Sequence, residues 1–445
     1  MKPTTAAAYK LMHDGAIAHA KIEAAGMKID VARLDKTIER VGVRIDRLTE
    51  KLKTDEVWTA WRRRYGEKTN IGSRQQLGQV VFGDLGYKTT GTTKTGRPKM
   101  DSEALEQVDL PFVKRFLQVE KLKKLRSTNL KGVRREVVDS FLHPSFNLHL
   151  ARTFRPSSDT PNFQNIPIRD KKIGKLIRSC FVPRPGHVLV EIDYGGHEFK
   201  VASCFWRDEK MMAYASDPDL DIHRDMAAEC YSLEPEEVTS SVRFFAKNQF
   251  VFPTLYGSYY VNTASNLWGV IGTAGLTRKD GQSLEDHLLG LGITEDNFVD
   301  HIQDVEERFN AWFPTWSDRK EKWWARYQKR GWFPMMTGFR VAGIYSRNNL
   351  FNTPVQGPAF HCLLWSLIRL VRWLEKRKMR TVIIGQIHDS IVADVHRDEL
   401  DEFLAKAKEI MTVDIRKAWP WVIVPFVVEA EIGEETWWEK KVVEI

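Results

Sequence analysis

The pattern of hydrophobic and polar positions predicts a chain that alternates between helical and strand-like segments. Apolar residues recur at the spacing of amphipathic helices in segments 10–53 (with a break near Gly26), 102–138, 221–257, 296–330, 354–377 and 398–416. Runs rich in β-branched residues lie around 187–193, 382–395 and 421–431, and another strand-like segment lies around 146–154. Segment 83–100 is rich in Gly and Thr, and we expect a mobile loop there. The pattern indicates an α+β protein whose strands gather into one sheet.

Two strand-like runs each carry an aspartate, one at its end and the other at a turn. The first run ends in Asp193 and Tyr194, and the second turns at His388 and Asp389. If these strands are neighbours, the two carboxylates meet at one edge of the sheet. Close carboxylates repel each other unless a proton or divalent cations lie between them, and Mg²⁺ prefers oxygen ligands. On spacing alone, two surface aspartates that never meet are an equally good interpretation.

The charge of the chain favours an anionic partner. The formal net charge is +8 over 445 residues. Nine Lys or Arg and two Glu lie between Val113 and Val138. A helix with so many cations could follow a phosphate backbone, although a solvated helix face is at least as good an interpretation.

Cysteine usage and hydropathy indicate a cytoplasmic protein that does not enter membranes. The four cysteines form no Cys-x-x-Cys pair and no zinc spacing, so we expect reduced thiols. The N-terminal ten residues lack the apolar core of a signal peptide. No run approaches the ~20 apolar residues that span a bilayer.

A segment between the two aspartates carries cations at helical spacing. Arg243 and Lys247 are one helical turn apart, so both could project from one face and grip a polyphosphate. Tyr256 and Gly257 are expected to close this helix. Pro253 cannot donate the helical hydrogen bond, so we expect a bulge or kink before the end of the helix.

These motifs, in this order, closely resemble the family A DNA polymerases, the group of bacterial DNA polymerase I and related phage replicases. Motif A of that family is a strand ending Asp-Tyr with a glutamate five residues after the aspartate, matched by Asp193, Tyr194 and Glu198. Motif B is a helix with Arg, Lys, an aromatic residue and Tyr-Gly. Motif C is His-Asp in a hairpin, matched by His388 and Asp389. Two further matching stretches are 161–167 (Pro-Asn-Phe-Gln-Asn-Ile-Pro) and 352–357 (Asn-Thr-Pro-Val-Gln-Gly).

The resemblance covers nearly the whole chain and implies a right-hand polymerase fold. Its palm would hold the acidic pair on an antiparallel sheet, beside a thumb and helical fingers. The implied division is thumb and N-terminal helices over 1–145, palm over 146–204 and 350–445, and fingers over 205–349. No segment remains for an exonuclease or 5′-nuclease domain. The one Asp-x-Glu in residues 1–140, at Asp101, is expected to open a helix instead of lying on a strand.

The resemblance also implies a reaction and its residues. A primer 3′-hydroxyl would attack a nucleotide α-phosphate, with two Mg²⁺ ions, replaceable by Mn²⁺, held by Asp193, Asp389 and the Tyr194 carbonyl. The nucleotide would be bound by Arg243, Lys247 (also a proton donor), His223, Glu198 (a steric gate against a 2′-hydroxyl), Phe252 and Tyr256. Primer–template contacts would come from Arg155, Gln164, Asn352, Gln356, His388 and Gly257. Structural alternatives are helix capping or packing for His223, a surface position for Glu198 and a turn for Gln164.

The chain departs from the family pattern in motifs B and C. One residue more than usual separates Lys247 from Tyr256, so counting from the lysine puts Val251 beneath the incoming sugar. Counting back from the tyrosine puts Phe252 there, which we favour, and a phenylalanine predicts discrimination against dideoxynucleotides. Ser390 follows Asp389 where the DNA polymerases usually carry glutamate. Single-subunit RNA polymerases of the phage and mitochondrial type share His-Asp-Ser.

The main interpretation is a monomeric DNA-templated DNA polymerase without proofreading, working in a bacterial or virus-infected cell. Its partners would be primer–template DNA and dNTPs, and a helicase-primase or processivity factor is left open. Its role would be replication or repair of phage or mobile-element DNA. The nearest alternative is a related nucleotidyltransferase that uses ribonucleotides or an RNA template. Glu198 argues against that alternative and Ser390 weakly for it, and a non-catalytic DNA-binding protein is the alternative from another class.

Overall fold

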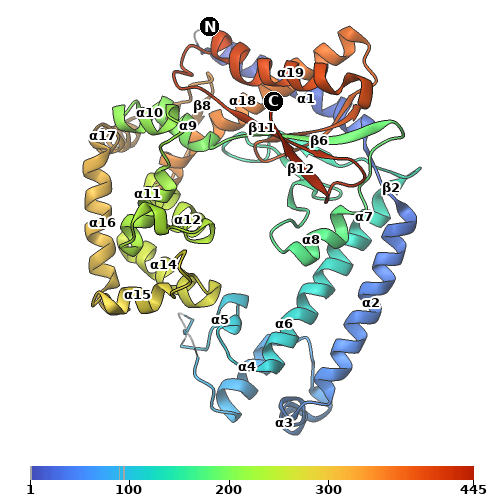
Figure 1. Ribbon diagram of the computed structural model, residues 1–445, viewed down its shortest axis with the longest axis vertical. Coiled ribbons are helices and arrows are strands. Elements are labelled where there is room, and N and C mark those ends of the chain that lie inside the picture. The colour runs from blue at the N-terminus through green and yellow to red at the C-terminus, as the bar shows by residue number, and fades with distance from the viewer. Residues whose placement is uncertain (1–2, 90, 94–95) are drawn as a thin grey trace.

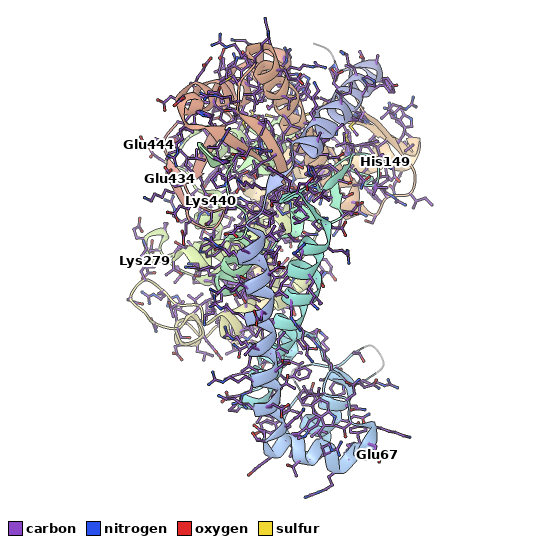
Figure 2. All side chains as sticks on the ribbon, turned by 90° about the vertical axis from the view of Figure 1, so that its right-hand side faces the viewer. Glu67, His149, Lys279, Glu434, Lys440 and Glu444 are labelled. Atoms are coloured by element: carbon purple, nitrogen blue, oxygen red, sulfur yellow. The ribbon has the colours of Figure 1, made fainter. Side chains whose placement is uncertain are left out.

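Two helical arms extend from a region that contains the main sheet (Figure 1). The computed structural model describes residues 3–89, 91–93 and 96–445. One arm is formed by helices from the N-terminal part of the chain and the other by helices from its middle. Figure 2 shows Glu67 at the far end of the N-terminal arm, away from Lys440 beside the sheet. The α+β class predicted from the sequence is confirmed.

The main sheet has five antiparallel strands in the order β12–β11–β6–β10–β9. Its strands are β6 (His187–Tyr194), β9 (Val382–Ile387), β10 (Ser390–His396), β11 (Val428–Gly433) and β12 (Lys440–Val443). The strand expected near 421–431 therefore begins later, at Val428. Because β6 is central, its residues have a strand neighbour on each side.

The expectation that all strands join one sheet is wrong. Three small sheets contain β1 (Met27–Lys28), β2 (Val137–Val138), β3 (Phe141–Leu142), β4 (Ser145–Asn147), β5 (Ser157–Asp159), β7 (Trp332–Pro334) and β8 (Arg340–Ala342). The strand expected over 146–154 ends at Asn147, because the chain turns and bends after it until Phe154 takes a positive φ of 55°.

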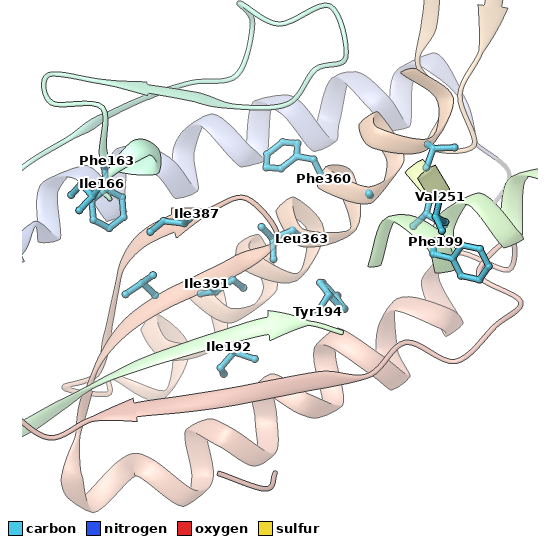
Figure 3. Packing of buried hydrophobic residues seen from close by; sticks show 14 of the residues in the cluster. Phe163, Ile166, Ile192, Tyr194, Phe199, Val251, Phe360, Leu363, Ile387 and Ile391 are labelled. Carbon is cyan, nitrogen blue, oxygen red and sulfur yellow. The ribbon is translucent and has the colours of Figure 1, made fainter. Parts of the chain in front are cut away.

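Alternation along β6 divides the main sheet into a packed face and a polar face. Val190, Ile192 and Tyr194 are buried, whereas Glu191 and Asp193 point to the other side. Figure 3 shows Ile192 and Tyr194 in one hydrophobic cluster with Leu363 of α18 (Arg347–Arg377). α1 (Thr5–Ala25) packs on α18 and β9. The packed face holds the strands rigidly and leaves the polar face available for chemistry.

The N-terminal arm is built around α2 (Val31–Lys53) and α6 (Pro111–Lys124), which pack on each other. Its other α-helices are α3 (Glu56–Tyr65), α4 (Arg74–Gly78), α5 (Ser102–Glu106) and α7 (Lys131–Glu136). Asp101 caps α5, as the sequence predicts. The expected loop at 83–100 is irregular after Asp84, and residues 90, 94 and 95 of it lie outside the described residues.

The central arm is helical, as predicted. Its α-helices are α11 (Ile222–Tyr231), α12 (Ser240–Ala246), α13 (Phe252–Leu255), α14 (Tyr260–Ala274), α15 (Leu284–Gly290), α16 (Phe298–Trp312) and α17 (Pro314–Arg330). The remaining α-helices are α8 (Lys171–Arg178), α9 (His197–Trp206), α10 (Glu209–Ser216), α19 (Leu400–Lys408) and α20 (Ile415–Ala418). None of the described helices is long and apolar enough to cross a bilayer. All four cysteines are buried free thiols.

Candidate active site

Asp193 and Asp389 lie side by side at one end of β6 and β10. The strand register puts Asp193 opposite Ser390, the residue after Asp389. The Tyr194 N–H donates to the Asp389 carbonyl over 3.4 Å, and His388 completes the turn with a φ of 48°. Burial, followed by the negative charge of Asp389, raises the pKa of Asp193 to about 7. The residues predicted to meet from distant strands are therefore neighbours.

The donors at this end of the sheet suit a hard cation. Within the described residues, no three His, Cys, Asp or Glu side chains form a metal site. The available donors are two carboxylates and nearby main-chain carbonyl oxygens, which leaves positions for water and phosphate oxygens. Mg²⁺ is commonly bound in this way. The repulsion that raises the pKa of Asp193 would be relieved by cations between the carboxylates.

A π-helical turn accommodates the extra residue of motif B. The turn η6 spans Lys247–Val251, and the Phe252 N–H donates to the Lys247 carbonyl, five residues earlier. The expected bulge is therefore present. Val251 is fully buried, whereas the Phe252 ring lies 5.7 Å from the Lys247 Nζ and stacks near Tyr256 with 6.0 Å between ring centroids. This arrangement favours Phe252 over the buried Val251 for the position beneath the incoming sugar.

The three residues expected at the triphosphate lie together on the central arm. The Arg243 Nε donates to Asp221 Oδ2 over 2.5 Å, and Asp221 caps α11 just before His223. Burial and the charges of Lys247 and Arg243 lower the pKa of His223 to about 3, so its imidazole is neutral at pH 7. Its buried Nδ1 has no hydrogen-bond partner among the residues that the structure describes. A ligand in this site could supply that partner.

Glu198 lies between the sheet and the central arm at the start of α9. The Tyr256 hydroxyl donates to Glu198 Oε2 over 3.2 Å, and an Arg155 guanidinium nitrogen lies 4.0 Å from Oε1. Burial and the charge of Asp389 raise the pKa of Glu198. The glutamate, tyrosine and arginine predicted for the sugar and primer sides therefore lie together, close enough to Asp389 for its charge to act on Glu198 and Tyr256.

Gln164 is tied to the hairpin that carries Asp389. The Gln164 Nε2 donates to Gln386 Oε1 over 2.7 Å, and the Gln386 Nε2 donates to the His388 carbonyl over 2.5 Å. Gln386 is buried in β9. The turn interpretation and the DNA-contact interpretation of Gln164 are compatible, because this bond uses only one of the two hydrogens on its amide nitrogen.

Asn352 and Gln356 lie one turn apart on α18, next to where the central arm packs. The buried Asn352 Oδ1 has no hydrogen-bond partner in the described part of the chain. Gly257 has a φ of 89°, and a Cβ there would lie 2.9 Å from the Phe351 ring. Only glycine therefore lets the end of motif B approach α18 so closely.

Three residues around the site were missed by the sequence reasoning. Asp221 accepts a hydrogen bond from Arg243, Gln386 donates one to the His388 carbonyl, and Glu191 accepts one from Ser390. The position of Asp221 just before a helical stretch is a capping signal that could have been recognised. Gln386 contacts His388 two residues away in the same hairpin, whereas the contact between Glu191 and Ser390 joins strands far apart in the sequence and has no local signal.

Family comparison agrees with this geometry. The model of DNA polymerase family A matches residues 41–289 and 325–439. The chain belongs to DNA polymerase family A. Among its family A relatives, DNA polymerase I of Lactococcus lactis subsp. cremoris is 30% identical over 432 residues, which cover 95% of this chain and 44% of that protein. The thermostable DNA polymerase I of Thermus thermophilus is 30% identical over 426 residues, covering 94% of this chain and 46% of that protein. The chain thus spans less than half the length of these relatives.

A solved polymerase-domain structure has the same fold. The polymerase domain of Pol1 from M. smegmatis, in complex with DNA primer-template and dNTP, superimposes with a TM-score of 0.76 and 24% identity. The alignment covers 96% of this chain and 70% of that one. The predicted right-hand polymerase fold is therefore confirmed. We call the main sheet region the palm, the N-terminal arm the thumb and the central arm the fingers, while the predicted boundaries between them stay predictions.

Proposed function

We propose that this chain is a DNA-templated DNA polymerase that extends a primer 3′-hydroxyl with dNTPs. The observation that carries the proposal is the pairing of Asp193 with Asp389 on the palm, with Arg243, Lys247 and His223 gathered on the fingers. Relatives named DNA polymerase I, and a structural neighbour bound to primer-template and dNTP, support this substrate class.

The palm would hold two Mg²⁺ ions through Asp193, Asp389 and the Tyr194 carbonyl, and Mn²⁺ could replace them. When bound, the ions would lower the pKa of the primer hydroxyl, neutralise the triphosphate and align the attacking and leaving oxygens. The contribution of the protein is to fix one carboxylate at the end of β6 and the other in the neighbouring turn before substrate arrives. This preorganisation avoids reordering the site during the reaction.

The fingers would bind the triphosphate. Arg243, whose guanidinium is oriented by Asp221, and Lys247 supply positive charge. His223 would act as a neutral hydrogen-bonding group, because its imidazole is not protonated at pH 7. Lys247 would give its charge or a proton to the leaving pyrophosphate.

Glu198 would select the sugar. Its carboxylate is held by Tyr256, beside Phe252, so it would occupy the space that a ribose 2′-hydroxyl needs. Phe252 would lie beneath the sugar, and Tyr256 would stack at the template side of the new base pair. This arrangement favours dNTPs over the ribonucleotides of the alternative interpretation.

Arg155, Gln164, Asn352, Gln356 and His388 would contact the primer–template near its growing end. Minor-groove acceptors are shared by correct base pairs, so donors from these side chains can sense pair shape without reading sequence. Gly257 would leave space for the template backbone at the end of motif B. On the thumb, Lys123 and Lys124 are exposed on α6 and would follow the phosphate backbone.

A primer-extension assay tests this proposal. DNA and RNA templates are each offered with dNTPs or NTPs, and we expect extension by dNTPs on the DNA template. Preferential use of NTPs or of an RNA template would identify the related nucleotidyltransferase instead. Tight primer–template binding with no extension in any combination would indicate a non-catalytic DNA-binding protein.

The chain is also proposed to act without proofreading, in replication or repair of phage or mobile-element DNA. Asp101 begins a helix, which is consistent with the expectation that the Asp-x-Glu there is not part of an exonuclease strand. A mismatched primer 3′ end should persist when the purified chain is incubated without dNTPs. Removal of that end would contradict the proposal.

A further inference from the structure

Glu191 connects the C-terminal segment of the chain to the turn that carries Asp389. It lies on β6 two residues before Asp193, on the same face of the sheet. Its Oε1 accepts a hydrogen bond from the Ser390 hydroxyl over 3.0 Å. Its Oε2 accepts from Trp437 Nε1 over 3.1 Å and from Lys440 Nζ over 2.6 Å. The carboxylate is thus fixed from two sides.

Ser390 is placed to control the geometry of the turn. It follows Asp389 directly and faces Asp193 across the β6–β10 pair. Its hydroxyl also lies 3.0 Å from the Ile387 carbonyl, on the opposite side of the turn. A hydroxyl has one hydrogen, so the Glu191 carboxylate competes with a bond inside the turn. The Ser390 hydroxyl therefore lies within hydrogen-bond distance of Glu191 on β6 and of Ile387 across the turn, and donates to one of them at a time.

Stability alone is a poor explanation for this arrangement. The side chains of Glu191 and Lys440 are 14% and 8% exposed, so most of their hydration is lost. A buried ion pair often contributes little net stability compared with apolar residues of similar size. Lys440, visible beside the sheet in Figure 2, instead holds a carboxylate that reaches the residue next to Asp389.

We propose that Glu191 is a positioning residue for the polymerase reaction, acting through Ser390 on Asp389. The inference rests on the proposed function. The carboxylate that contacts Ser390 comes from the neighbouring strand β6. Lys440 and Trp437 donate hydrogen bonds that orient the Glu191 carboxylate, and this carboxylate accepts the hydrogen bond from Ser390. Ser390 thereby positions the turn so that Asp389 stays aligned with Asp193.

The cleanest test is Ser390→Ala in the full chain, because it breaks the connection to the turn and leaves Lys440 and Trp437 on Glu191. We expect kcat for dNTP addition to fall about tenfold or more, since small misplacements of reacting groups are costly. The KM for dNTP and the Kd for primer–template should stay within about twofold, because binding groups are untouched. The midpoint of urea unfolding should fall only slightly, because a single buried hydrogen bond is lost.

Glu431→Gln is the matched control. Glu431 is the second carboxylate bound by Lys440, and it pairs with that lysine instead of with Ser390. If Glu431→Gln lowers kcat as much as Ser390→Ala, or if Ser390→Ala keeps kcat within about twofold of wild type, the inference is overturned. A fall in kcat that follows lowered stability and DNA affinity would likewise overturn it. Wild-type chain that does not extend primers would refute the proposed function instead, so the two failures are distinguishable.

A reciprocal exchange gives a second, independent readout. Ser390→Glu alone places two carboxylates together and should lower kcat. The double variant Glu191→Ser/Ser390→Glu again has one carboxylate at this place. Its kcat should be at least about tenfold higher than that of Ser390→Glu, because residues in direct contact do not act additively. A double variant no more active than Ser390→Glu would contradict the inference.

Discussion

The Tyr256 hydroxyl of the fingers donates a hydrogen bond to the Glu198 carboxylate at the edge of the palm, with 3.2 Å between the oxygens. This bond joins the residue that ends α13 to the first turn of α9. Because Asp389 acts electrostatically on both groups, the bond lies close to the acidic pair. The orientation of the predicted steric gate is therefore set by a residue of motif B.

Changing this pair should alter sugar selection. Glu198→Ala should raise the kcat/KM for NTPs relative to dNTPs by about 100-fold, because a clash with the 2′-hydroxyl is removed. Tyr256→Phe should raise the same ratio by up to about tenfold, the effect of one lost hydrogen bond. Steady-state incorporation of dCTP and CTP opposite guanine measures both ratios. Tyr259→Phe, at an exposed tyrosine nearby, is the control, and an unchanged ratio in Glu198→Ala would refute the gate.

Phe252→Tyr should increase the use of dideoxynucleotides. A phenolic hydroxyl beneath the sugar could replace interactions of the missing 3′-hydroxyl, with an effect of about tenfold. Chain-termination assays with mixed ddNTP and dNTP would measure the ratio. Phe244→Tyr adds the same hydroxyl at an exposed position and should leave termination unchanged. Equal behaviour of the two variants would show that Phe252 does not lie beneath the sugar.

The sequence predicts the parts of this site that have local signals. The β-branched runs ending at Asp193 and entering Asp389 are strands, and their adjacency follows from sheet pairing. Counting residues could not decide between Val251 and Phe252, because the π-helical turn changes the helix phase and depends on backbone hydrogen bonds.

Contacts between distant segments were not predictable from periodicity. Asp221 meets Arg243, and Glu191 meets Ser390, only after the fingers and the palm have folded. The strand expected over 146–154 shows a different kind of error. The prediction continued past Asn147, where the strand ends and the chain turns. Such short strands are decided by tertiary packing more than by propensity.

Neutralising the exposed end of α6 should weaken DNA binding in a salt-dependent way. Lys121, Lys123 and Lys124 are exposed, and Lys121 also pairs with Glu106. Changing all three to Gln should reduce the slope of log Kd against log salt by about 2 to 3, as expected for two or three lost phosphate contacts. Fluorescence anisotropy over a salt series measures this slope. The matched control changes Lys406 and Lys408 of α19 and Lys417 of α20 to Gln. An equal reduction of the salt slope in this control would show that only the net charge of the protein matters.

Glu399 should make the stability of the chain depend on acid pH. Burial acts to raise its pKa, but hydrogen bonds from Thr381 and Arg380 outweigh burial and lower the pKa to about 2. Since its ordinary pKa is 4.5, the stabilisation is complete above that pH and is lost as pH falls through about 2. The difference in unfolding free energy between wild type and Glu399→Gln should therefore shrink below about pH 4.5. Urea unfolding across pH measures it, with exposed Glu402→Gln as control. A difference independent of pH would contradict this assignment.

The most direct test of the central claim is Asp389→Ala, measured by primer extension and by primer–template affinity in the same preparation. The account predicts that extension falls by at least about 1000-fold, because the paired carboxylates act as a unit, while the Kd for DNA changes little. Asp398→Ala, an exposed aspartate after β10, should extend primers normally. Extension by Asp389→Ala at a rate close to that of wild type would contradict the account.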